Sequence, residues 1–415
     1  MPASLLLNPF RKVIGPNTAT ADLADVADFA PAVAQRVRAF HATFSQYSPT
    51  PLVALPGLAG ELDLKNVCVK DESHRFGLNA FKVLGGSYSM AKFVAQRLGI
   101  DVSELNYDKF VSPELREQFG QATFFTATDG NHGRGVAWAA ARLGQKAIIF
   151  MPKGTTQTRL ENIQKEGAQV TIEDLNYDDC VRKAVAEAAK VPNGVVVQDT
   201  AWDGYEDIPS WIMQGYGTMA SEAGDQLADA GVMPTHIVVQ AGVGSLAGAV
   251  VGYFTNLYKD APQKPKLIVV EAQAADCLYQ GALANDGAPR KVGGDLPTIM
   301  AGLACGEPNT ISWDILRNHV DVFVSAPDWV TELGMRMSAA PLKGDTPVVS
   351  GESGAVPFGT VAAAMTVPGL EGLRKDLGLD ENSKVLCFST EGDTDPIRYR
   401  EIVWQGRHFE DGHEI

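Results

Sequence analysis

The sequence predicts an α/β protein built on two open, mainly parallel, twisted sheets flanked by helices. Short apolar runs alternate with stretches of helical periodicity along most of the chain, and this alternation is typical of βαβ units. The runs are apolar almost throughout, as expected of parallel strands that are buried on both faces. Nine such runs are too many for one sheet in a compact unit of ordinary size, so we expect two sheets.

Each predicted strand contains the branched or aromatic side chains that favour extended backbone. In chain order the predicted strands are Asn66–Lys70, Ala122–Thr128, Lys146–Pro152, Ala168–Asp174, Gly194–Asp199, His236–Gly242, Lys266–Ala272, Asp321–Ser325 and Lys384–Thr390. Helical periodicity lies between several of them, at Gly135–Leu143, Gln157–Gly167 and Tyr177–Lys190. The least regular stretches, Asp101–Gly120 and Ala282–Asp314, are expected to be long connections.

We expect residues 91–205 to form a small domain, and residues 1–90 and 206–415 to form a large one. Ligands of open α/β sheets bind at the carboxyl ends of the strands, where the chain turns into the next helix. Several unusual motifs of this chain fall at such strand ends, so we look for the functional site there.

Composition excludes several classes of function. The formal net charge is -15 and no run of Lys and Arg forms a basic stripe, which argues against nucleic acid and anionic membranes as partners. The apolar stretch in Met1–Val13 is too short for a signal peptide, and no segment approaches a bilayer-spanning length. A cytoplasmic protein is the simplest expectation.

The cysteines and histidines predict neither a disulfide framework nor a metal site. The five cysteines are widely spaced without a CxxC pair, and the seven histidines show no HExxH or comparable spacing. Cys277 and Cys305 are a candidate pair, but isolated buried thiols are the favoured interpretation.

The segment "NAFKVLGG", Asn79–Gly86, places one lysine between an aromatic residue and two glycines. Lys82 is either a solvated cation at a helix start or an amine placed to form a Schiff base. The segment alone leaves the choice open.

The segment "TDGNHGRG", Thr128–Gly135, follows a predicted strand and opens a helix. Its small and polar residues suit a tight turn, and a helix start offers free N–H groups to an anion. Asp129 adds a candidate general base and Asn131 a neutral donor. Taken alone, the segment is more simply a helix start with its normal capping residues.

The segment "QAGVGSLAG", Gln240–Gly248, also follows a strand and opens a helix. Glycines let the backbone approach a phosphate, and the helix start supplies N–H donors. The spacing is close to a dinucleotide fingerprint, and Glu271 ends the next strand where a ribose-binding acid would stand. A nicotinamide enzyme therefore competes with other phosphate sites and with plain helix–strand packing.

Two further segments, "GESGA" (Gly351–Ala355) and "LCFSTEGDTD" (Leu386–Asp395), complete the series. The second places the hydroxyls of Ser389 and Thr390 at the end of an apolar strand. Together and in this order, the five segments resemble the tryptophan-synthase-β family of pyridoxal-phosphate (PLP) enzymes, also called fold type II. The resemblance spans roughly Pro51 to the last predicted strand.

The resemblance implies a site between the two domains with PLP attached to Lys82. It implies that the loop Gly242, Val243, Gly244, Ser245 and Leu246 binds the phosphate. Asn131 would donate to the phenolic oxygen, and Ser389 or Thr390 would meet the ring nitrogen. It also favours a PLP enzyme over a nicotinamide enzyme, which has no need of the lysine.

The resemblance also assigns substrate-binding residues. The substrate carboxylate would lie on the turn formed by Thr128, Asp129, Gly130, Asn131 and His132. Within the family, "NAFKVLGGSY", "TATDGNHGRGVAWAA", "QDTAWDGYEDIP" and "CFSTEGDTDP" are most similar to the branch that eliminates ammonia from 2,3-diaminopropionate.

Serine and threonine dehydratases of the family carry a serine where this chain has Asp129. The departure favours the ammonia-eliminating branch, with Lys82 as base for one enantiomer, Asp129 for the other, and Asp199 holding the β-ammonium. For Asp199 a helix-capping role is an equal alternative. A serine or threonine dehydratase, or another β-eliminating lyase, stays the competing function, and the family is usually homodimeric.

Overall fold

The computed structural model describes residues 10–14, 26–410 and 413–414. The apolar part of Met1–Val13, on which the signal-peptide prediction depends, lies outside these residues. No helix in the described ranges is long and apolar enough to cross a membrane.

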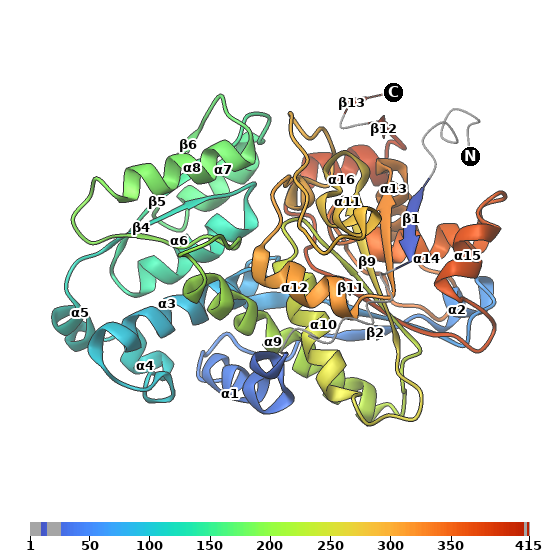
Figure 1. Ribbon diagram of the computed structural model, residues 1–415, viewed down its shortest axis with the longest axis horizontal. Helices are drawn as coiled ribbons and strands as arrows, with labels where there is room; N and C mark the ends of the chain where they lie inside the picture. The colour runs from blue at the N-terminus through green and yellow to red at the C-terminus, as the bar shows by residue number, and fades with distance from the viewer. Residues whose placement is uncertain (1–9, 15–25, 411–412, 415) are drawn as a thin grey trace.

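Two mainly parallel sheets form the framework (Figure 1). The larger has seven strands in the order β1-β10-β9-β8-β11-β3-β2, and its two edge strands run antiparallel to their neighbours. The smaller has four parallel strands in the order β6-β5-β4-β7. The strands are β1 Arg11–Ile14, β2 Leu52–Ala54, β3 Asn66–Asp71, β4 Thr123–Ala127, β5 Lys146–Met151, β6 Gln169–Ile172, β7 Gly194–Val196, β8 His236–Gln240, β9 Lys266–Ala272, β10 Val322–Ala326 and β11 Lys384–Ser389.

All nine predicted strands are present, and the prediction of two mainly parallel sheets is confirmed. The sequence did not reveal β1 and β2, which are short strands at the sheet edges, nor the small hairpin β12 (Phe409–Glu410) and β13 (His413–Glu414). Edge strands are buried on fewer sides than central ones, so they lack the continuous apolar run that marks the others.

Helices cover both faces of each sheet. They are α1 Pro31–His41, α2 Pro56–Glu61, α3 Val83–Leu98, α4 Tyr107–Phe110, α5 Pro113–Phe119, α6 Asn131–Arg142, α7 Gln157–Gln164, α8 Tyr177–Ala188, α9 Asp207–Asp229, α10 Ser245–Leu257, α11 Cys277–Ala284, α12 Thr310–His319, α13 Asp328–Ala339, α14 Val356–Thr366, α15 Glu371–Leu377 and α16 Pro396–Val403. The three predicted helices correspond to α6, α7 and α8.

Alternate residues of the central strands serve different cores. Ile237 and Val239 of β8 belong to the core shared with α1, α3, α9, α10 and α12. Val238, between them, belongs to the core shared with α2, α13, α14 and α15. In the smaller sheet, Phe124 packs with α3 and α6, whereas Phe125 packs with α8. Both sheets are thus buried on both faces, as parallel sheets generally are.

The segment Asp101–Gly120 is more regular than predicted, because it contains α4 and α5. The side chains of Asn106 and Ser112 accept hydrogen bonds from the first turns of these helices, and Phe110 and Leu115 anchor them in the core. The helices are too short for a visible apolar period. The second irregular segment is largely a connection: between α11 and α12 lies only the 3-10 turn Ala301–Leu303.

Candidate active site

The predicted site residues converge where the carboxyl ends of both sheets face each other. One cavity is lined by the ends of β8 and β11, the loops after β4 and β7, and the start of α3. Its lining includes Phe81, Lys82, Asn131, Tyr177, Asp199, Tyr216, Gln240, Gly242, Val243, Gly244, Ser245, Leu246, Cys305, Ser353 and Thr390. Residues far apart in the sequence thus meet at one point, as the resemblance implied.

The last strand fixes the segment that carries Lys82. Ala80 forms an isolated antiparallel bridge with Glu391, and the N–H of Phe81 donates to the carbonyl of Thr390 at 3.1 Å. The Phe81 ring packs on Tyr216 with centroids 4.7 Å apart. Lys82 then begins α3 as its N-cap residue, so its backbone is held on three sides.

The glycines that follow the lysine let helices approach closely. A Cβ added to Gly85 would lie 2.7 Å from Ile212 and Tyr216 of α9. A Cβ on Gly86 would lie 3.2 Å from the backbone of Gly135 in α6. The pair is therefore needed because α3 is wedged between α9 and α6, not because it binds a ligand.

Lys82 forms a buried ion pair. Its Nζ donates to Oδ2 of Asp199 at 3.0 Å, and Asp199 is 3% exposed. The other carboxylate oxygen accepts hydrogen bonds from the Tyr177 hydroxyl at 3.1 Å and from Gln198 Nε2 at 3.2 Å. Sequence analysis missed Tyr177, which gave no signal beyond starting a predicted helix.

Electrostatics keep both members of this pair charged. Burial opposes the charge on Lys82, but Asp199 and Asp129 outweigh it and raise the pKa of the lysine above its ordinary value. Burial likewise opposes the charge on Asp199, but His132, Lys82 and the Tyr177 hydroxyl outweigh it and lower the pKa of that carboxyl. A helix-capping role for Asp199 is not seen, since the next helix, α9, begins at Asp207 and has Glu206 as its N-cap.

His132 lies behind Asp199. Its Nε2 faces the carbonyl of Val197 at 2.8 Å, and because a carbonyl only accepts, this nitrogen carries the proton. Nδ1 lies 3.8 Å from Asp199 Oδ2 and has no hydrogen-bond partner among the described residues. Burial is the largest cause of its lowered pKa, and the charge of Asp199 opposes it. The His132 side chain therefore supports Asp199 and does not line the cavity.

The glycine loop has the form of a phosphate cradle. Gly244 has φ +103, and a Cβ there would also lie 2.7 Å from Ser312 Oγ. It forms the N-cap of α10, whose first-turn N–H groups have no carbonyl partner within the helix, and the loop lines the inner cavity. The Ser245 hydroxyl is already engaged: it donates to the carbonyl of Asp199 and accepts from Asn309 Nδ2 at 2.8 Å. Backbone N–H groups are therefore the main donors of this loop.

The turn after β4 caps the start of helix α6 and also contributes a residue to the inner cavity. The Thr128 hydroxyl accepts from the N–H groups of Gly130 and Gly133, both at 2.9 Å, so it acts as a helix-capping group. Asn131 Nδ2 donates to Oε2 of Glu391 at 2.5 Å, across the space between the sheets. Its amide is thus held by the last strand, at the edge of the cavity that it lines.

Asp129 faces a second, outer cavity of about 240 Å³ beside the first. Its Oδ2 pairs with Arg159 Nη1 at 3.3 Å, and Arg159 Nη2 reaches Glu352 Oε2 at 3.6 Å. Tyr177 lines both cavities. Burial, opposed by Arg159, raises the pKa of Glu352 to about 7. Glu352 lies within the "GESGA" segment but was not predicted as a site residue, and Arg159 lies in no motif.

The two hydroxyls at the end of β11 differ in position. Thr390 lines the inner cavity and accepts a hydrogen bond from Gln240 Nε2 at 2.7 Å. Ser389 donates to Ser350 Oγ at 2.8 Å and is absent from the cavity lining. Of the two candidates for the ring nitrogen, the geometry favours Thr390.

Three residues that entered the alternative interpretations, Glu271, Cys277 and Cys305, are buried and lie apart from those roles. Glu271 is 0% exposed, and its carboxylate oxygens accept N–H groups at the start of α11, from Leu278 at 2.9 Å and Tyr279 at 2.7 Å. The side chain therefore fixes the start of α11 and does not face a ribose. Cys277 and Cys305 are buried free thiols, as are the other three cysteines.

The residues of the inner cavity fit PLP. Lys82 supplies the amine, and Gly244 begins a helix in a cradle that a Cβ would fill. Thr390 offers a hydroxyl whose proton goes to no acceptor among the described residues. PLP needs an amine for its aldehyde, N–H groups for its phosphate and a hydrogen-bond donor for its ring nitrogen. The cavity offers all three.

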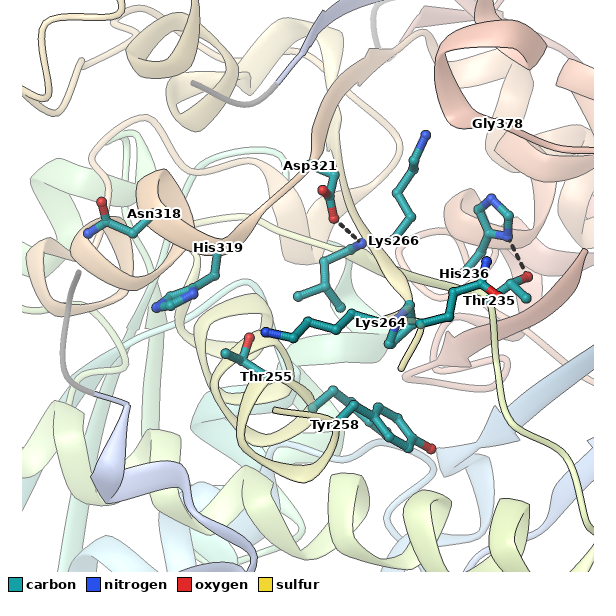
Figure 2. Close-up of a pocket in the computed structure, with 14 residues that line it drawn as sticks. Thr235, His236, Thr255, Tyr258, Lys264, Lys266, Asn318, His319, Asp321 and Gly378 are labelled. Carbon is teal, nitrogen blue, oxygen red and sulfur yellow. Dashed lines mark hydrogen bonds between the residues drawn. The ribbon is translucent and has the colours of Figure 1, made fainter. Parts of the chain in front are cut away.

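A larger cavity of about 430 Å³ lies at the amino-terminal ends of β8 and β9, away from these residues (Figure 2). Its polar groups largely pair with each other: His236 contacts Thr235 Oγ1 and the carbonyl of Leu377, and Asp321 accepts from the N–H of Leu267. It contains none of the predicted site residues. Its size alone does not make it the functional site.

Comparison with known proteins agrees with this chemistry. The family described as "Pyridoxal-phosphate dependent enzyme" matches residues 43–390. Diaminopropionate ammonia-lyase of Salmonella typhimurium is 52% identical over 377 residues, which cover 90% of this chain and 93% of that protein. A crystal structure of diaminopropionate ammonia lyase from Escherichia coli in complex with D-serine has a TM-score of 0.88 and 44% identity, covering 96% of this chain and 97% of that one. Another structure of that enzyme, in complex with an aminoacrylate-PLP azomethine reaction intermediate, has a TM-score of 0.86 with the same identity and coverage.

Proposed function

The chain belongs to the family of pyridoxal-phosphate-dependent enzymes, and we propose that it converts 2,3-diaminopropionate, in both the D and the L form, to pyruvate and two molecules of ammonia. The cofactor is PLP. The observation that carries the substrate assignment is the buried carboxylate of Asp199 beside Lys82 in the cavity wall.

The reaction balances with one molecule of water. A base removes the Cα proton, the Cβ–N bond breaks, and its electron pair leaves with the β-amine as ammonia. Water then hydrolyses the released enamine to pyruvate and a second ammonia. Bound PLP supplies the electron sink that makes the Cα proton acidic.

Asp199 is the residue that we assign to the leaving group. An amine is a poor leaving group unless it is protonated, and a carboxylate favours the protonated form by charge-assisted hydrogen bonding. Burial opposes the charge of Asp199, but the neighbouring Lys82 amine and Tyr177 hydroxyl help to hold its pKa below the ordinary range. A hydroxyl substituent would gain less from the same carboxylate.

Lys82 and Asp129 are the proposed bases for the two enantiomers. Lys82 would hold the cofactor and, once freed, accept the Cα proton on its own side. Asp129 lines the neighbouring cavity, and Tyr177 lies between the two cavities as a shared wall. This separation supports bases on opposite faces of the substrate.

The remaining assignments complete the proposal. Gly242, Val243, Gly244, Ser245 and Leu246 would bind the phosphate, largely through backbone N–H groups. Thr390 would meet the ring nitrogen. The turn from Thr128 to His132 would receive the substrate carboxylate at the start of α6. We also propose residues 91–205 as the small domain and, from the family resemblance, a homodimer. A cytoplasmic location is proposed from the sequence pattern.

The test compares kcat/KM for pyruvate formation from D- and L-diaminopropionate, L-serine and L-threonine. Each charge-assisted hydrogen bond is worth about 1.5–3 kcal/mol, and about 1.4 kcal/mol corresponds to a factor of ten. We therefore expect diaminopropionate to be preferred by roughly ten- to hundredfold or more. Equal or higher values for serine or threonine would return the protein to the dehydratases.

A further inference from the structure

Gln240 joins three of the segments that sequence analysis singled out. It ends β8, immediately before the glycine loop. Its side-chain Nε2 donates to the carbonyl of Ser353 in the "GESGA" segment at 3.0 Å and to Thr390 Oγ1 beside the last strand at 2.7 Å. Gln240 is 1% exposed, yet it lines the inner cavity together with both partners.

The orientation of this amide is determined by its partners. A backbone carbonyl only accepts hydrogen bonds, so nitrogen and not oxygen faces Ser353. The opposite orientation would place two acceptor oxygens 3.0 Å apart. The second N–H of the same nitrogen then goes to Thr390, while Gln240 Oε1 has no partner among the described residues.

This orientation decides what the Thr390 hydroxyl can do. Because Oγ1 receives an N–H from Gln240, its own proton is free to be donated. No described protein acceptor takes that proton, and the residue is 3% exposed. A buried hydroxyl of this kind requires an acceptor in the cavity.

We propose that Gln240 is a positioning residue that makes Thr390 a hydrogen-bond donor to the ring nitrogen of PLP and thereby holds that nitrogen unprotonated. A neutral pyridine nitrogen has one lone pair and accepts such a bond. A protonated nitrogen would instead need Oγ1 as acceptor and would leave the Thr390 proton buried without a partner.

The consequence is control over the type of reaction. An unprotonated ring withdraws fewer electrons from Cα than a protonated one, which favours prompt loss of a β-substituent over reactions that need a long-lived carbanion. The inference rests on the placement of Thr390 in the proposed function, but not on the identity of the substrate.

The experiment measures the ring nitrogen itself. Wild type, Gln240→Met and Gln240→Glu are loaded with PLP labelled with ¹⁵N in the ring, and the ¹⁵N chemical shift is followed as a function of pH. Methionine removes the N–H but keeps the length of the side chain. Glutamate replaces the N–H with an acceptor, so Thr390 would donate to it and offer a lone pair to the ring nitrogen. Gln280→Met on α11, at a residue that does not line the inner cavity, is the matched control.

We expect an unprotonated nitrogen in wild type and in Gln280→Met at neutral pH. In Gln240→Met the pKa of the ring nitrogen should rise by about one to two pH units. Oγ1 of Thr390 would then receive no N–H from residue 240, and the carbonyl of Ser353 would be released to accept the Thr390 proton. Gln240→Glu should raise it further. The same variants should form more transamination by-product per pyruvate.

A protonated ring nitrogen in wild type at neutral pH would overturn the inference. So would an identical titration in wild type and Gln240→Met. If Gln240→Glu does not fold, the methionine variant alone decides. Failure of the proposed substrate is seen separately, because the labelled spectrum is recorded without any amino acid present.

Discussion

Nζ of Lys82 lies 3.0 Å from Oδ2 of Asp199 in a site where neither charge is freely hydrated. The two residues come from opposite sides of the site, the start of α3 and the loop after β7. The carboxylate therefore pairs with the lysine in the wall of the inner cavity. In the proposed function, Asp199 would contact both the Lys82 amine and the β-amine of the substrate.

Lys82→Ala should abolish turnover, with a loss of at least about a hundredfold in kcat, because the variant lacks both the attachment amine and a general base. PLP should still bind noncovalently through the loop at Gly244, as measured by an absorbance titration. Lys92→Ala on the same helix α3 is the control. Near-normal activity of the first variant would refute the assignment of the lysine.

Asp199→Asn should lower kcat/KM for diaminopropionate by about ten- to hundredfold more than for L-serine, since the amide cannot pair with a β-ammonium by a charge-assisted bond. The ratio of the two substrates is the quantity to measure. Asp203→Asn, an exposed acid in the same loop, should leave the ratio unchanged. A parallel loss on both substrates would show that Asp199 acts only through Lys82.

Asp129→Asn should reduce activity on D-diaminopropionate far more than on the L form, because only one face of the substrate would lose its base. Pyruvate formation from each pure enantiomer gives the comparison. Asp295→Asn alters another acid of the same outer cavity and serves as control. If both enantiomers suffer equally, Asp129 positions the substrate instead of removing a proton.

Glu352→Gln should raise the free energy of unfolding, relative to wild type, by more at pH 8 than at pH 5. The folded protein keeps the Glu352 proton up to a pKa of about 7, above its ordinary 4.5, so its stability falls as the pH rises through that window. Glutamine removes this loss, worth on the order of 1–3 kcal/mol for a buried group.

Thermal unfolding at several pH values measures this effect of Glu352. Glu114→Gln, at an exposed position, should show the same melting temperature difference at each pH. A pH-independent effect of Glu352→Gln would mean that the carboxyl is ionised throughout, held by Arg159.

The parts of the fold that could be predicted from the sequence are those with an uninterrupted apolar run. Central strands such as β8 are apolar on both faces, so their runs are visible without any structure. The site motifs were predictable for a related reason, since strand-to-helix turns need unusual residues such as the glycine at 244. The edge strand β2 and the short helix α4 carry neither signal.

Residues that contact the site from a distant helix or loop could not be predicted from the sequence. Arg159 is an ordinary arginine in α7 until the fold brings it to Asp129, and Tyr177 is an ordinary aromatic residue until its hydroxyl reaches Asp199. Gln240 was visible within a motif, but its role depends on the direction of its amide. Such directions are set by the partners, which only the folded chain assembles.

The hydrogen bond from Asn131 to Glu391 also links the two sheets. Asn131 opens a helix of the smaller sheet, whereas Glu391 follows the last strand of the larger one and also receives the N–H of Ser353 at 3.0 Å. Any separation of the two sheets along this side must release a buried carboxylate from its donors. The same side chain therefore orders the Asn131 amide beside the cavity and resists opening of the site.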